Sequence, residues 1–161
     1  METIDLNQIR KDFSLPKEED FSGCLDGQHA YKYFGGLTLT EAYDIFLKNA
    51  DFHYEDFQYL MPYAFFYYFP VIDKYWREVA PYSELDDLDF WHLESVISAQ
   101  LSDKKIDRRL LPEIKKLCDF CEGLMRRVLT DPEELNPSLK RWYKMLTYYH
   151  KLSKQTHIID S

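Results

Sequence analysis

A chain of 161 residues, 45% of them hydrophobic, can build one packed domain and is too short for two independent cores. Its net charge of −8 argues against nucleic acid as the main partner, because neutralising phosphates requires a basic surface. Only five glycines occur, which disfavours a turn-rich β fold. We therefore predict an all-α, single-domain irregular helical bundle of about six or seven helices over residues 1–161.

The first residues predict a helix followed by a loop. Apolar residues spaced as on one helical face indicate a helix over residues 4–13. Residues 14–36 contain a proline and four of the five glycines, so we expect this segment to be loop-rich. Thr38 and Glu41 have the spacing of a capping box, which predicts a helix from there to about Asn49.

The middle of the chain predicts two more helices. Asp51 is a candidate N-cap for a short helix over residues 52–60. A helix over residues 62–79 would begin with a proline at its first position, where the missing N–H costs nothing. Pro70 is expected to kink or break that helix, because its ring clashes with the carbonyl of Phe66 and it donates no hydrogen bond.

The last half of the chain predicts three or more helices with clear boundaries. Ser83 opens a helix over residues 83–101, and Pro112 opens the most regular one, with an apolar stripe as far as Val128. Asp131-Pro132 is a helix start, and Asn136-Pro137 repeats the signal. The last helix is expected to end at about Ser153, leaving residues 154–161 as a frayed tail.

The ends and the cysteines indicate a cytoplasmic protein. No apolar region of a secretory signal follows the first residues. The longest uncharged stretch, residues 57–72, is 16 residues long and contains two prolines, whereas a membrane helix needs about 20 apolar residues. The three cysteines form no even disulfide framework. We expect no membrane span.

Two motifs could hold a metal, but their context favours structural roles. Cys118 and Cys121 lie in mid-helix on the apolar stripe, and no second ligand pair completes a zinc site, so we expect them in the core. The pairs Asp26/His29 and Asp89/His92 have i, i+3 spacing but lack the glutamates of di-metal bundles. A helix-capping Asp89 beside a half-exposed His92 explains the second pair.

No sequence motif for catalysis is present: there is no G-x-S-x-G elbow, phosphate-binding loop or dinucleotide-binding glycine pattern. We therefore expect no enzyme activity, no cofactor, no metal and no catalytic residue.

The aromatic residues concentrate in one segment. Between residues 52 and 76, 12 of 25 residues are aromatic, out of 27 in the chain. Most of this ring area is expected in the core, because an exposed patch of that size would aggregate. The alternative is that Tyr59, Tyr63, Tyr67 or Tyr68 provides anchors at an interface, where tyrosine is enriched.

The charges divide along the chain. Residues 1–103 carry 20 acidic and 7 basic residues, a net charge of −13, whereas residues 104–161 carry 8 and 13, a net charge of +5. The acidic run at residues 84–89 contains more acids than the dipole of one helix can stabilise. A clustered negative face would steer a basic protein partner. The predicted partner-binding residues are Asp51, Glu55, Asp56, Tyr59, Tyr63, Glu84, Asp86, Asp87 and Asp89.

The stretch from Tyr33 to Trp76 resembles an uncharacterised family of small bacterial all-helical proteins. The shared features are the F-G-G turn, a Thr-led helix with Glu-Ala, an acidic segment, and the A-F-x-Y-Y-x-P motif of residues 64–70. That resemblance implies a helical fold and no catalytic residues. The whole chain also resembles the immunity proteins of bacterial toxin systems, which are short, acidic, cytoplasmic and helical.

The leading hypothesis is therefore a non-catalytic protein-binding protein. It would act as an immunity protein whose acidic face occludes the active site of a basic toxin domain, such as a nuclease. The first alternative is a homodimeric structural or regulatory module that associates through the aromatic segment. The second is a metal-dependent helical-bundle enzyme.

Overall fold

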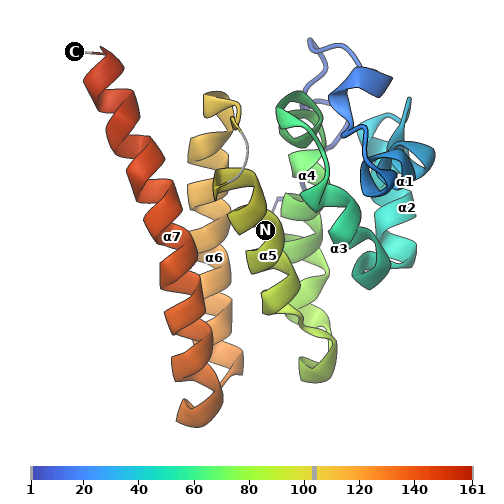
Figure 1. Ribbon diagram of the computed structural model, residues 1–161. Coiled ribbons are helices and arrows are strands. Elements are labelled where there is room, and N and C mark those ends of the chain that lie inside the picture. Colours follow the sequence, from blue (N-terminus) through green and yellow to red (C-terminus); the bar gives the residue numbers. More distant parts are fainter. Residues whose placement is uncertain (1, 103–104, 161) are drawn as a thin grey trace.

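Seven α-helices make up most of the computed structural model (Figure 1), which describes residues 2–102 and 105–160, with side chains to residue 155. They are α1 (Leu25–Phe34), α2 (Leu39–Lys48), α3 (Ala50–Gln58), α4 (Pro62–Glu78), α5 (Phe90–Ser102), α6 (Leu111–Val128) and α7 (Pro132–Asp160). Within the described ranges there is no strand, and one isolated bridge joins Phe21 to Leu60. The predicted all-α bundle is confirmed.

The helices are arranged around α4 and α5. Figure 1 shows α1–α3 on one side of this pair and α6 and α7 on the other. Helix α4 packs against α2 and α6, and α5 packs against α3 and α7. No helix in the described part of the chain is both long enough and apolar enough to cross a lipid bilayer.

Helix α4 is the centre of the core and continues unbroken through Pro70. Every residue from Ala64 to Ile72 is buried, so the aromatic segment packs inside the molecule. The expected break is absent. A proline at position 70 leaves the carbonyl of Phe66 without its helical N–H donor, and the side chain of Arg10 supplies one, with Nε 3.0 Å from that oxygen.

The predicted helix over residues 4–13 is wrong, because this segment forms a series of turns. Arg10 has a φ of 61°, a left-handed conformation that interrupts any helix. Its guanidinium lies 4.0 Å from the ring centre of Phe66, and its Nη2 donates to both carboxylate oxygens of Glu113. The segment therefore serves to position one arginine across the N-terminal part of α4 and the start of α6.

The predicted loop over residues 14–36 is wrong for its second half, which forms α1. Cys24 is the N-cap, and its sulfur accepts a hydrogen bond from the N–H of Gly27. Gly27 indicated a loop in the sequence, but here the glycine allows close packing: a Cβ at this position would lie 1.9 Å from the carbonyl oxygen of Ser22. The helix ends at Gly35-Gly36, and Gly36 has a φ of 75°.

Several helix starts agree with the sequence and three boundaries do not. The capping box of Thr38 and Glu41 is present, and Pro62 begins α4. The helix predicted at residues 83–101 begins only at Phe90, after a short 3₁₀ helix (Leu85–Asp87). Helix α7 begins at Pro132, continues through Pro137 and extends to Asp160, past the predicted end at residue 153. Asp51 lies in the first turn of α3, whose N-cap is Asn49.

Candidate functional site

The exposed side of α3 carries the first half of an acidic surface. Asp51 and Glu55 are four residues apart and therefore lie on the same side of the helix, where both are exposed. Asp26 of α1 lies across a shallow cavity of about 350 Å³ from Glu55. Tyr59 lines the same cavity, and the negative charge of Asp26 raises the pKa of its hydroxyl.

The segment before α5 carries the second half. Asp89 caps α5 through a hydrogen bond from the N–H of His92, and its carboxylate lies close to that of Asp51. Burial raises the pKa of the half-buried Tyr75, and the negative charges of Asp51 and Asp87 raise it further. Acidic residues far apart in the sequence therefore meet between α3 and the start of α5.

We call this combined surface the acidic face. It consists of Asp26, Asp51, Glu55, Asp87 and Asp89, together with Glu84 and Asp86, which are exposed in the same acidic run before α5. Large apolar side chains lie along it: Phe52 is 45% exposed on α3, Leu85 is 46% exposed within the acidic turn, and Trp91 is 56% exposed in the first turn of α5. Exposed rings beside carboxylates are a composition suited to protein interfaces.

The carboxylates of the acidic face are not neutralised by neighbouring bases. Among the described residues, the lysine and arginine ion pairs that the structure shows involve other acids: Asp73, Glu78, Asp107, Glu113, Asp119 and Glu122. Helices α6 and α7 carry nine basic and six acidic residues. Arg141 of α7 lines a small cavity with Trp91 and Glu94 of α5, so the basic helices lie next to one edge of the acidic face.

Asp56 belongs to a different structure, inside the fold. It is 2% exposed and lies on the inner side of α3, so its position differs from that of the other predicted partner-binding acids. One carboxylate oxygen lies 2.6 Å from Nδ1 of His29, and the other lies 2.9 Å from Nδ1 of His53. A carboxylate in this position accepts from both rings and joins α1 to α3.

Sequence reasoning could have found only part of this buried cluster. His53 and Asp56 are three residues apart on one helix, so their contact is readable from spacing. His29 is 27 residues away from Asp56 and was paired instead with Asp26. Its true partner depends on the packing of α1 on α3, which no local pattern reveals.

Tyr59 and Tyr63 lie in different places. Tyr59 is at the end of α3, beside the acidic face. Tyr63 is in the first turn of α4, where its hydroxyl donates to the carbonyl of Ser14 at 2.6 Å. Tyr67 and Tyr68 are buried, and Tyr68 bonds two backbone carbonyls. Of these four tyrosines, only Tyr59 is positioned to contribute to the acidic face.

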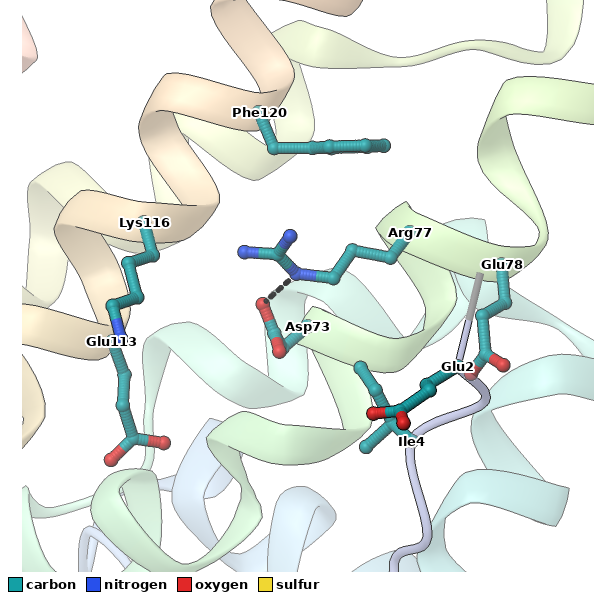
Figure 2. Close-up of a pocket in the computed structure, with 8 residues that line it drawn as sticks. All are labelled: Glu2, Ile4, Asp73, Arg77, Glu78, Glu113, Lys116 and Phe120. Atoms are coloured by element: carbon teal, nitrogen blue, oxygen red, sulfur yellow. Dashed lines mark hydrogen bonds and ion pairs between the residues drawn. The ribbon is translucent and has the colours of Figure 1, made fainter.

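A second cavity, of about 360 Å³, lies between α4 and α6 and was not predicted (Figure 2). Arg77 extends into it, bonds Asp73 at 3.0 Å and lies 5.1 Å from the ring centre of Phe120. Burial raises the pKa of Asp73, and the arginine partly offsets this effect. Four acids and two bases line this cavity, so charges of both signs face it.

The three cysteines are free thiols, two of them buried and one exposed. Cys118 and Cys121 are buried in α6, and burial raises the pKa of Cys118 to about 12. The predicted core position of this pair is confirmed. Cys24 is exposed, and a hydrogen bond from Ser22 lowers the pKa of its thiol.

Comparison with known proteins finds no match: no family model, no curated protein and no solved structure matches this chain.

Proposed function

We propose that the protein is a non-catalytic, cytoplasmic binding protein that holds a basic protein partner against the acidic face. The observation that carries this proposal is the meeting of Asp51 on α3 with Asp89 before α5, with no lysine or arginine among the described residues bonded to either carboxylate. An unneutralised cluster of this kind attracts an oppositely charged surface and accelerates its association.

The exposed apolar residues support the proposal that the acidic face binds a partner and does not serve only to keep the surface hydrated. Phe52 and Trp91 border the carboxylates, and each leaves about half of its surface in water. Burying such rings against a partner provides affinity, whereas the surrounding charges mainly provide rate and selectivity. The chain's resemblance to immunity proteins suggests the form of this function: occlusion of the active site of a basic toxin domain.

The homodimer alternative has less support. It relied on the aromatic segment as an interface, and the residues from Ala64 to Ile72 are all buried. What remains exposed near this segment, such as Phe52, belongs to the acidic face, where two copies would repel each other.

The test is a comparison of two charge reversals against a partner isolated from the source cells. The first variant is Asp86→Lys with Asp87→Lys on the acidic face. The matched control is Glu133→Lys with Glu134→Lys, which makes the same change in net charge at an exposed position on α7. We expect the first variant to lower the association rate constant by about tenfold or more at low salt, and the control to change it little.

Stopped-flow or surface-plasmon measurements over a range of salt concentrations would provide these rates. Loss of the salt dependence in the acidic-face variant alone would support the proposal. Equal effects of the two variants would mean that only net charge matters, and the acidic face would then have no special role.

A further inference from the structure

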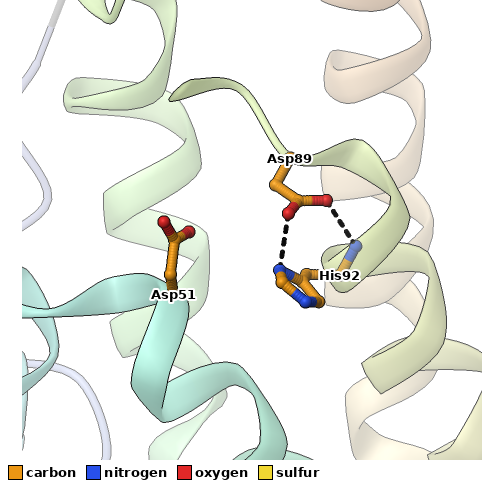
Figure 3. Close-up of side chains that lie close together, drawn as sticks. All are labelled: Asp51, Asp89 and His92. Carbon is orange, nitrogen blue, oxygen red and sulfur yellow. Dashed lines mark hydrogen bonds and ion pairs between the residues drawn. The ribbon is translucent and has the colours of Figure 1, made fainter. Parts of the chain in front are cut away.

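We propose that Asp51, Asp89 and His92 form a binding site for one divalent transition-metal ion, with zinc as the best fit. The donor atoms of these three side chains, one from α3 and two from the start of α5, all lie within 4.8 Å of one another. Figure 3 shows the two carboxylates and the imidazole directed toward a common region. Asp51 and Asp89 also belong to the acidic face, but the argument for an ion rests on their donor atoms and that of His92 rather than on the proposed function.

The geometry is close to what a single ion requires. Zinc binds carboxylate oxygens and imidazole nitrogens at about 2.0–2.2 Å, which places neighbouring donors roughly 3.3–3.6 Å apart in a tetrahedron. The donors of His92 and Asp89, 2.6 Å apart, would have to open by about 1 Å or less, whereas that of Asp51, within 4.8 Å of the others, would have to close by about 1.5 Å or less. Asp51 is exposed in the first turn of α3, so a change in its side-chain rotamer can make this movement without any shift of the backbone.

His92 is held beside one of the two carboxylates. Its Nδ1 is inaccessible to solvent and lies 2.6 Å from an oxygen of Asp89, and the two side chains form an ion pair that Figure 3 marks with a dashed line. A metal ion at this site would replace the proton between these two atoms, which would move apart to the spacing of two ligands of one ion.

The imidazole is held in place by its neighbours. Tyr54 stacks on the ring of His92, with ring centres 5.5 Å apart and planes 26° apart, and Trp91 contacts it at 5.1 Å. Asp89 is held as well, because its other oxygen accepts the N–H of His92 at 3.0 Å. Two of the three ligands are thus fixed before the ion binds, which lowers the cost of forming the site.

The ligand set selects the class of ion. An imidazole nitrogen with two carboxylates suits zinc and other first-row transition metals, whereas magnesium and calcium prefer oxygen ligands alone. Three protein ligands leave a fourth position for water. An ion here would also offset the repulsion between Asp51 and Asp89 and would tie α3 to the start of α5.

Isothermal titration of the full-length, chelator-treated protein with zinc chloride provides the test. We expect one equivalent to bind, with Asp51→Asn weakening the affinity by about tenfold or more and His92→Gln weakening it further. The matched controls are Asp86→Asn, which removes one charge from the same face outside the cluster, and His150→Gln, which removes an exposed histidine from α7. Both should bind as the wild type does.

A second readout identifies the ligand atom. Zinc should shift the ¹⁵N resonance of His92 Nδ1. Zinc should also raise the melting temperature of the wild type but not that of Asp51→Asn. This comparison remains informative even if the His92→Gln variant fails to fold. Absence of one-to-one binding at zinc concentrations up to about 100 μM would overturn the proposal. So would binding that neither ligand variant weakens, or a preference for magnesium over zinc.

Discussion

Replacing Asp56 with alanine is expected to destabilise the fold by about 3–5 kcal/mol. The chain contains 28 acids, and nothing in the sequence shows that Asp56 is buried whereas its neighbour Glu55 is exposed. The carboxylate accepts from His29 at 2.6 Å and from His53 at 2.9 Å. A hydrogen bond to a charged group contributes about 1.5–3 kcal/mol. The side chain of His53 is only 5% exposed, so the variant would leave its N–H buried without a partner, whereas His29 is 41% exposed and can turn to water.

This difference in exposure predicts an order among variants. Asp56→Asn keeps the size of the side chain and one acceptor, so it should cost about half as much as Asp56→Ala. Glu55→Ala on the adjacent, exposed position is the control and should change stability by about 0.5 kcal/mol or less. Urea denaturation at pH 7.5 measures each free energy of unfolding. A loss below about 1 kcal/mol for Asp56→Ala would refute the reasoning, because it would mean that the two histidines are not held by this carboxylate.

Three further predictions concern the buried amide, a helix cap and the thiols. Gln100 is fully buried and donates to the carbonyls of Phe57 and Leu60, so Gln100→Met, which keeps the volume, should cost about 2–3 kcal/mol in urea denaturation. Hydrogen bonds from Thr38 lower the pKa of Glu41 below its ordinary value. The ionised Glu41 side chain therefore contributes its full stabilisation above the ordinary pKa and loses it as the pH falls through the lowered pKa. Between pH 6 and pH 3, the melting temperature of Glu41→Gln should therefore decrease less than that of the wild type. A thiol reagent at neutral pH should label one cysteine quickly, and Cys24→Ser should abolish that fast phase, because the two thiols of α6 are buried.

Local signals predicted the helices whose starts are encoded by neighbouring residues. Thr38 and Glu41 specify a capping box with only four residues, and the structure has it. Pro62 begins α4 for an equally local reason. The apolar stripe of α6 could be predicted, because a helix that buries one face must repeat its apolar residues at helical spacing.

The errors arose where a distant residue decides the outcome. Pro70 was expected to kink or break α4; the helix does not break, and Arg10, 60 positions earlier in the chain, donates to the carbonyl that the proline leaves unbonded. The same arginine adopts a left-handed conformation, so the predicted helix over residues 4–13 does not form. Both errors involve Arg10, and no sequence pattern within either segment indicates its role.

The candidate site shows the same limit. Composition along the chain predicted that acids would gather, and Asp51 does meet Asp89, but the sequence could not show that Asp56 turns inward while Glu55, one residue earlier, turns outward. Which side of α3 is exposed depends on how α1 and α5 cover it, and the contact between His29 of α1 and Asp56 is part of that packing. The buried carboxylate thus helps to orient α3 and, with it, the exposed acids. A variant at Asp56 should therefore weaken partner and metal binding only to the extent that it unfolds α3, which separates its structural role from the binding roles of Asp51 and Glu55.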